Sequence, residues 1–129
     1  MTICIDIPGL RLESEANSRS HWSGRAARVK GQRDVVSMVL AARVGRKALE
    51  LLGAESARVP LDVTITRIAP RKLDQGGNLY ASAKAVQDEV AQLLGVDDRK
   101  EQQVRYVVEQ SSRGREYGTE IKIAPRGAP

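Results

Sequence analysis

Three residue types are scarce in this chain, whose 129 residues include one cysteine, one histidine and no phenylalanine. One cysteine cannot form a disulfide within the chain, and one cysteine with one histidine is too few for a zinc cage. We expect Cys4 to be a small, buried hydrophobic residue in a strand rather than a nucleophile. The absence of a disulfide framework favours a reducing, cytoplasmic location.

Aromatic residues and long apolar runs are scarce as well. Only 3% of the residues are aromatic, which argues against a platform that stacks successive unpaired bases. No apolar run reaches membrane-spanning length, and the N-terminal MTICIDIPG lacks the basic and apolar parts of a secretory signal. We therefore expect no membrane partner.

Positive charge is abundant, with a formal net charge of +5 and a sequence pI near 9.7. A basic balance favours a polyanionic partner. Because the few aromatic residues disfavour a stacking platform, duplex or branched DNA held through its phosphates fits better. Such binding weakens steeply with salt, since each neutralised phosphate releases counterions.

The hydrophobic patterns predict an α+β fold, with a mixed four-stranded sheet backed by two helices. Strands are expected over residues 2–7, 59–68, 103–110 and 117–124, the last two as a hairpin, and helices over 24–52 and 79–94. The element order is therefore strand, helix, strand, helix, strand, strand. At this length we expect one domain over residues 1–129, with residues 125–129 frayed.

The first expected helix combines an apolar stripe with a basic remainder. Gly31 and Gly45 weaken it by about 1 kcal/mol each relative to alanine, so either can mark a bend. The basic face carries few acids, and it is open whether this face is only solvated or contacts phosphate through Arg25 and Arg28. The residues predicted to be buried are Val29, Val36, Leu40, Val44, Ala48, Leu51 and Leu52.

The second helix follows a short segment that combines basic, acidic and glycine residues. Arg71 and Lys72 precede Asp74, and Asn78 is placed to cap a helix that begins near Leu79. Gly95 is expected to end this helix. Its predicted core-facing stripe comprises Leu79, Ala83, Val86, Val90, Leu93 and Leu94.

Acidic residues flank this helix on both sides. Lys84 and Asp88 lie one turn apart on its polar face, and Asp97-Asp98 follow its end. If the loops before and after the helix meet, Asp74 joins these side chains. Two carboxylates about 4 Å apart repel by roughly 4 kcal/mol at an effective dielectric of about 20, so such a cluster needs a cation.

Oxygen ligands of this kind suit Mg²⁺ or Mn²⁺. The simpler alternative is a solvated turn and a surface ion pair worth about 0.3–0.5 kcal/mol.

The order basic residue-Leu-Asp, Asn-Leu, Lys, Asp, and then Leu-Gly-Val-Asp-Asp before a strand resembles the RusA family of Holliday-junction resolvases, including its phage and prophage members. This resemblance implies a RusA-like fold and a homodimeric, Mg²⁺-dependent endonuclease. Such an enzyme nicks four-way DNA junctions symmetrically in recombination and repair, and needs no organic cofactor. Mn²⁺ is expected to substitute for Mg²⁺.

The resemblance also assigns roles to individual residues. Asp74 and Asp98 match the catalytic, metal-binding acids, Lys84 matches the catalytic lysine, and Asp88 and Asp97 are further candidate metal ligands. The segment around Asn17, Arg19 and Arg25 loosely resembles a DNA-contacting loop of the family. Arg71 and Lys72 are placed to hold the substrate backbone beside the acids.

One position departs from the family's pattern, because Gly77 stands where a second aspartate commonly precedes the Asn-Leu pair. Two alternatives to the endonuclease therefore stay open. One is a RusA-like junction-binding protein with impaired or lost cleavage. The other is a small basic interaction module whose acids are only surface charges.

Overall fold

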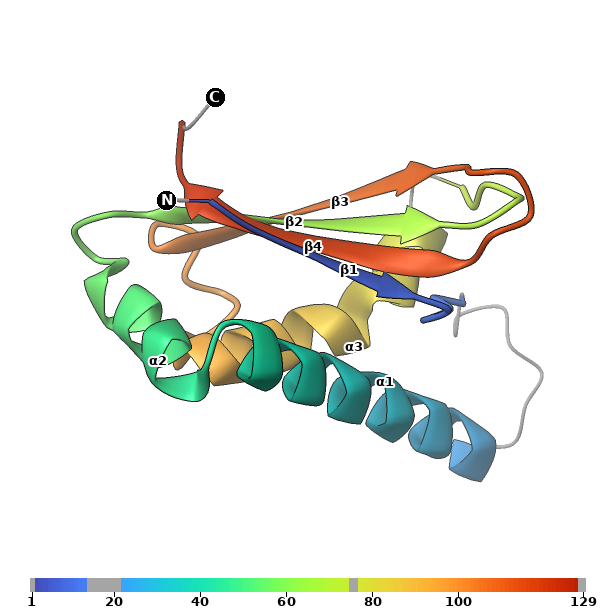
Figure 1. The fold of residues 1–129 in the computed structure, drawn as a ribbon, viewed down its shortest axis with the longest axis horizontal. Helices are drawn as coiled ribbons and strands as arrows, with labels where there is room; N and C mark the ends of the chain where they lie inside the picture. Colours follow the sequence, from blue (N-terminus) through green and yellow to red (C-terminus); the bar gives the residue numbers. More distant parts are fainter. Residues whose placement is uncertain (1, 14–21, 75–76, 128–129) are drawn as a thin grey trace.

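A four-stranded sheet with three helices on one of its faces makes up this α+β domain (Figure 1). The structure, a computed structural model, describes residues 2–13, 22–74 and 77–127. The elements are β1 (Ile3–Pro8), α1 (Trp22–Arg43), α2 (Arg46–Glu55), β2 (Leu61–Ile68), α3 (Gly77–Leu94), β3 (Val104–Ser111) and β4 (Gly118–Pro125). The predicted fold class and mixed sheet are confirmed, with three helices instead of two.

The strands lie in the order β1-β4-β2-β3. β2 pairs in parallel with β3 and antiparallel with β4, and β4 pairs antiparallel with β1. The predicted hairpin is therefore wrong, because β2 lies between β3 and β4. Alternation along a strand shows which residues face the core, but not which strand lies alongside. The helix α3 provides the long connection that the parallel β2–β3 pair requires.

The strands bury alternate side chains. In β2, Leu61, Val63 and Ile65 are buried, while the residues between them are half-buried. β1 lies at an edge of the sheet and buries Ile5 and Ile7 against the helices. The prediction for Cys4 is wrong: it lies in β1 but is exposed, because its side chain is on the opposite face of the sheet from the buried residues.

The first predicted helix is two helices, α1 and α2, separated at Val44 and Gly45. Gly45 has φ +97°, a left-handed conformation that interrupts the helix and resets its phase. Leu49 is consequently buried, whereas Ala48 and Leu51, both assigned to the buried stripe, are exposed. The bend expected at Gly31 or Gly45 is thus a full break at Gly45.

The helix α3 packs against α1, α2 and the strands β2 and β3, and all six residues of its predicted stripe are buried. Gly53 of α2 lies so close to the end of α3 that a Cβ atom there would overlap the carbonyl oxygen of Leu94. The position of α2 therefore fixes the C-terminal end of α3.

The end of the sheet extends further than predicted. Pro125 is still part of β4, and the Arg126 backbone N–H donates to the Pro60 carbonyl. The Arg126 guanidinium donates to Asp62 and to the Glu101 carbonyl. Fraying from residue 125 is therefore incorrect for Pro125 and Arg126. Among the described residues, no helix is both long and apolar enough to cross a membrane.

Candidate functional site

The C-terminal end of α3 is closed by a glycine cap that directs the chain back along the helix. Gly95 has φ +71°, and its N–H donates to the Ala91 carbonyl. The Val96 N–H also donates to the Ala91 carbonyl and the Gly95 N–H also donates to the Gln92 carbonyl, and these two bonds are the pattern of a Schellman motif. The predicted helix end is confirmed, and the cap delivers Asp97 and Asp98 to the side of α3.

Three side chains meet there, and we call them the ion triad: Lys84, Asp88 and Asp98. The Lys84 Nζ lies 2.9 Å from an Asp88 carboxylate oxygen and 2.7 Å from an Asp98 carboxylate oxygen. Lys84 and Asp88 are neighbours on α3, whereas Asp98 comes from the turn after it. The Asp98 side chain is 22% exposed and that of Lys84 is 58% exposed, so the triad is open to solvent on one side.

The charges of the triad stabilise one another. Hydrogen bonds to Asp98 and Asp88 raise the pKa of Lys84 above its ordinary value, so the ammonium stays charged near neutrality. Because both carboxylates contact the same ammonium, their oxygens are held close together. The lysine offsets a repulsion that would otherwise act between the two carboxylates.

Asp97, beside Asp98, has a different partner. Its carboxylate accepts hydrogen bonds from the Arg99 backbone N–H and guanidinium, at 2.9 Å and 3.2 Å. These contacts hold the pKa of Asp97 well below its usual range. Asp97 lines the same open basin of about 640 Å³ as the triad. Its carboxylate, however, forms an ion pair with Arg99 and not with Lys84.

The sequence did not single out Tyr106 of β3 as a candidate site residue. Tyr106 of β3 packs against the core, and its hydroxyl oxygen is buried without a hydrogen-bond partner among the described residues. Burial raises the pKa of Tyr106, and the negative charges of Asp98 and Asp88 raise it further. Strand alternation identified Tyr106 only as one position of a strand, and nothing in the local sequence shows that its hydroxyl lies near two acids.

Asp74 lies at the other end of α3. Because β2 and β3 are parallel, the chain leaves β2 at one end of the sheet and enters β3 at the opposite end (Figure 1). The residue before Asp74, Leu73, exchanges hydrogen bonds with the Gln110 side chain near the end of β3. Within the described residues, no hydrogen bond or ion pair joins Asp74 to the triad. The two acidic segments therefore do not converge as a set.

Asn78 is inside the first turn of α3 and not at the cap position, since the helix begins at Gly77. Its side-chain amide donates to the Asp74 carboxylate over 3.4 Å, and the Leu79 N–H donates to the Asp74 carbonyl. The Asp74 backbone carbonyl thus accepts a backbone N–H from the first turn of the helix.

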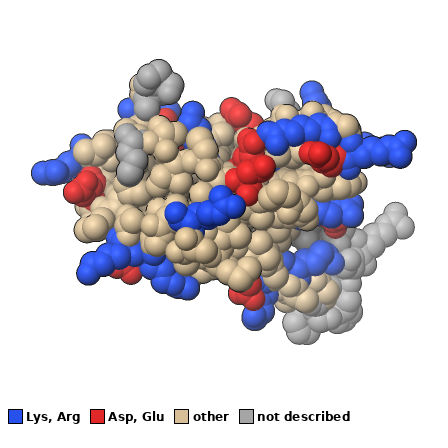
Figure 2. Space-filling model, viewed as in Figure 1, with Lys and Arg blue, Asp and Glu red and all other residues tan. Residues whose placement is uncertain are grey.

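The candidate DNA contacts are distributed over several elements. Asn17 and Arg19 lie outside the described residues. Arg25 is exposed and Arg28 is half-buried on α1, while Arg71 and Lys72 are exposed near Asp74. On the face shown in Figure 2, Lys and Arg side chains are spread across the surface, with a group of Asp and Glu side chains among them. The basic side chains on this face do not form one continuous patch.

The donor set at the triad can be compared with the Mg²⁺ that the resemblance implies. Mg²⁺ is usually held by one or two carboxylates together with waters and substrate phosphates. Asp88 and Asp98 fit that pattern, whereas Asp74 does not line the basin that contains them and Asp97 is paired with Arg99. Across residues 2–13, 22–74 and 77–127, no group of three or more His, Cys, Asp or Glu side chains could hold a metal ion together.

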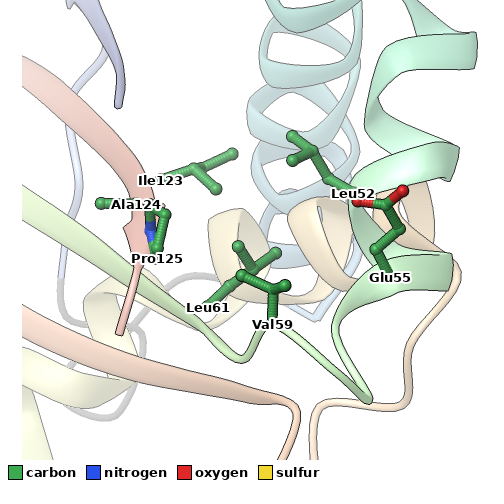
Figure 3. A pocket seen from close by; sticks show the side chains of 7 residues that line it. All are labelled: Leu52, Glu55, Val59, Leu61, Ile123, Ala124 and Pro125. Atoms are coloured by element: carbon green, nitrogen blue, oxygen red, sulfur yellow. The ribbon is translucent and has the colours of Figure 1, made fainter. Parts of the chain in front are cut away.

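A second hollow lies away from these charges. It has a volume of about 190 Å³ and separates Leu52 and Glu55 of α2 from the end of β4 (Figure 3). Val59 and Leu61 form its floor, and Glu55 is its only charged lining residue. This apolar lining does not suit a phosphate or a hydrated cation.

Neither a protein-family model nor a curated protein sequence matches the chain. The functional interpretation therefore depends on the chemistry of the site itself.

Proposed function

We propose that the protein is a Mg²⁺-dependent endonuclease for branched DNA, of the RusA type, with its site at the ion triad. The observation that supports this most is the contact of one lysine ammonium with both Asp88 and Asp98. Asp98 follows Lys84 by fourteen residues, and the resemblance matches Lys84 and Asp98 to catalytic positions and makes Asp88 a further candidate metal ligand.

Each residue of the triad has a role in phosphodiester hydrolysis. Asp88 and Asp98 would hold the cation, which when bound activates water and offsets charge on the phosphate. Lys84 presents an ammonium beside these carboxylates, where it stabilises the negative charge that develops on the phosphate. The open basin leaves one side of the triad accessible to a DNA backbone.

The remainder of the chain supplies substrate binding in this proposal. A net charge of +5 favours association with DNA, and Arg25, Arg28, Arg71 and Lys72 are the candidate phosphate contacts. A homodimer with twofold symmetry would place two triads for paired nicks in a four-way junction. A cytoplasmic location, expected from the single cysteine, would give such an enzyme access to DNA.

The test is cleavage of a labelled four-way junction with Mg²⁺ or Mn²⁺, beside a linear duplex of equal length. We expect symmetric, metal-dependent nicks in the junction and few in the duplex. Asp98→Asn removes one charge of the triad without changing its shape, and it is expected to abolish nicking while leaving junction binding nearly intact. Junction binding without any nicking by the unaltered protein would contradict the endonuclease proposal.

A second candidate is a junction-binding protein that does not cleave. It is favoured by the separation of Asp74 from the triad and by Gly77, which leaves the N-terminal end of α3 without a second acid. In that case Lys84 is a permanent partner of the two carboxylates. Equal, salt-sensitive junction affinity with and without Mg²⁺, together with no nicks, would identify this function.

A further inference from the structure

The strand β3 forms an edge of the sheet that is open to pairing. It pairs in parallel with β2 on one side, and no strand of the described residues pairs with its other side. Its eight residues, VRYVVEQS, include neither proline nor lysine. The strand β1 at the opposite edge has six residues and ends at Pro8. Because short length and proline protect an edge strand from further pairing, β3 is the less protected edge.

The pairing with β2 determines which backbone groups of β3 point outward. The Leu61 N–H donates to the Gln103 carbonyl, so the odd-numbered residues of β3 direct their backbone groups towards β2. The even-numbered residues direct theirs to the open edge. Among the described residues, nothing there bonds to the backbones of Tyr106 and Val108. An antiparallel partner strand would bond to these two residues.

The charged side chains of β3 are complementary to themselves about Val107. Arg105 and Glu109 are exposed, carry opposite charges and lie on either side of Val107, on the face of the sheet opposite the helices. Arg105 contacts Asp62 at 3.0 Å, and its side chain is still 54% exposed. Glu109 forms no ion pair with any residue that the structure describes. In an antiparallel pair of two β3 strands centred on Val107, each Arg105 lies opposite Glu109 of the second copy.

The same register satisfies the open backbone groups. It places Tyr106 opposite Val108 of the second copy, and these are the residues whose N–H and C=O point outward. The two charges then occupy positions between the hydrogen-bonded pairs, where opposed side chains lie closest. Moving the centre by one residue to either side keeps the backbone bonds but separates the charges. Only the register centred on Val107 meets both conditions.

We propose that two copies of this chain associate through β3, as an antiparallel pair with a twofold axis at Val107, so that the sheet continues from one copy into the other. The axis is perpendicular to the sheet, which keeps the helices of both copies, and with them both ion triads, on one face. The occupant of this edge is a second copy because the edge complements itself. The inference rests on the homodimer of the proposed function but not on cleavage.

The test is sedimentation equilibrium of the full chain, without DNA or metal, at concentrations up to about 100 µM, which detects micromolar association. We expect the unaltered protein to have twice the mass of one chain, 14.1 kDa. Glu109→Arg places like charges opposite each other at both positions and should weaken association at least about 10-fold. Glu50→Arg makes the same charge change at an exposed position of α2 and is the matched control. A monomeric unaltered protein, or equal association of Glu109→Arg, would overturn the inference.

Mixing two variants tests the register. Arg105→Glu also places like charges opposite each other, so it should associate as weakly as Glu109→Arg. In an equimolar mixture of the two variants, every opposed pair again combines an acid and a base. The mixture should associate at least about 10-fold more tightly than either variant alone. Equal association of the mixture and the separate variants would overturn the register.

Circular dichroism melting checks that each variant is folded, because Arg105→Glu also loses the ion pair with Asp62. If that variant does not fold, the comparison of Glu109→Arg with Glu50→Arg decides the inference by itself. A dimer that Glu109→Arg dissociates, in a protein that makes no nicks, would support this interface and contradict only the endonuclease. Symmetric nicking by a protein whose dimer is unchanged in Glu109→Arg would contradict only this interface.

Discussion

The two ends of α3 carry similar acidic residues in different surroundings. At the C-terminal end, a glycine cap and the close contact with α2 hold the chain so that Asp98 meets Lys84 and Asp88. At the N-terminal end, Asp74 is exposed and its side chain contacts Asn78. The comparison shows that acids near one helix form a site only where the backbone brings the chain back alongside that helix.

The difference follows from topology. A parallel strand pair joined by a helix places the helix start at one end of the sheet and the helix end at the other. Lys84 precedes Leu94, the last residue of α3, by about 15 Å along the helix axis, so its 2.7 Å contact with Asp98 requires the chain after Gly95 to run back beside the helix.

The largest expected effect is on the contact that fixes the C-terminal end. In Gly53→Ala, the added methyl group would overlap the Leu94 carbonyl, so α2 and α3 must separate. We expect a loss of about 3 kcal/mol in the free energy of unfolding, at the upper end for overpacking. Urea unfolding followed by circular dichroism measures it.

Gly31→Ala is the matched control for that variant. No atom lies within 4 Å of the added Cβ in α1, so the variant should gain about 0.5–1 kcal/mol from reduced backbone entropy. Equal destabilisation by both variants would show that the Gly53 contact does not fix the helix end.

A smaller loss of stability is expected when the Lys84 ammonium, which both carboxylates of the triad contact, is removed. Lys84→Met leaves Asp88 and Asp98 facing each other without compensation, and we expect a loss of about 1 kcal/mol for this partly exposed set. The variant should bind Mn²⁺ more tightly than the unaltered protein, because no ammonium competes for the carboxylates. Calorimetry measures the affinity, and weaker Mn²⁺ binding would indicate that Lys84 does not compete with the metal.

The contribution of Lys84 to stability also depends on pH. Its pKa is raised in the folded state above 10.5, so the stabilisation is complete below that pH and is lost as pH rises through the folded-state pKa. The difference in unfolding free energy between the unaltered protein and Lys84→Met should therefore shrink between about pH 9 and about pH 12. Urea unfolding at both values measures it, and a difference that grows would refute the pairing.

The smallest effect is expected at the N-terminal end of α3. Gly77→Asp introduces the aspartate that commonly precedes Asn-Leu in the RusA family, which the chain resembles. Apart from its chain neighbours and the backbone of α3, no described atom lies within 4 Å of the added Cβ. A negative charge at a helix start should stabilise by about 0.3–1 kcal/mol. Since this end is separate from the triad, the rate of junction nicking should stay the same. A large increase in rate would place the catalytic site at the N-terminal end.

Local patterns were sufficient for much of the fold and part of the site. The stripe of α3, its end at Gly95 and the placement of Lys84 beside Asp88 depend only on residues close in sequence, and periodicity captures those. The buried residues of α2 were predicted wrongly because the periodic pattern was extended through Gly45. A positive φ at Gly45 interrupts the helix there, so the buried face starts anew in α2.

Long-range relations could not be predicted in the same way. The position of β2 between β3 and β4 depends on pairing, which alternation does not encode. That pairing separates Asp74 from Asp98 and places Tyr106 near the triad. The sequence therefore identified the acids but not which of them lie together.

The most direct test of the account is to compare Asp98→Asn with Asp74→Asn in the four-way junction assay with Mg²⁺. We expect Asp98→Asn to lower the nicking rate at least about 100-fold, more than the loss typical of residues that only orient a metal's ligands. Asp74→Asn should nick at nearly the rate of the unaltered protein. Loss of nicking in Asp74→Asn, with Asp98→Asn still active, would contradict a catalytic site at the ion triad.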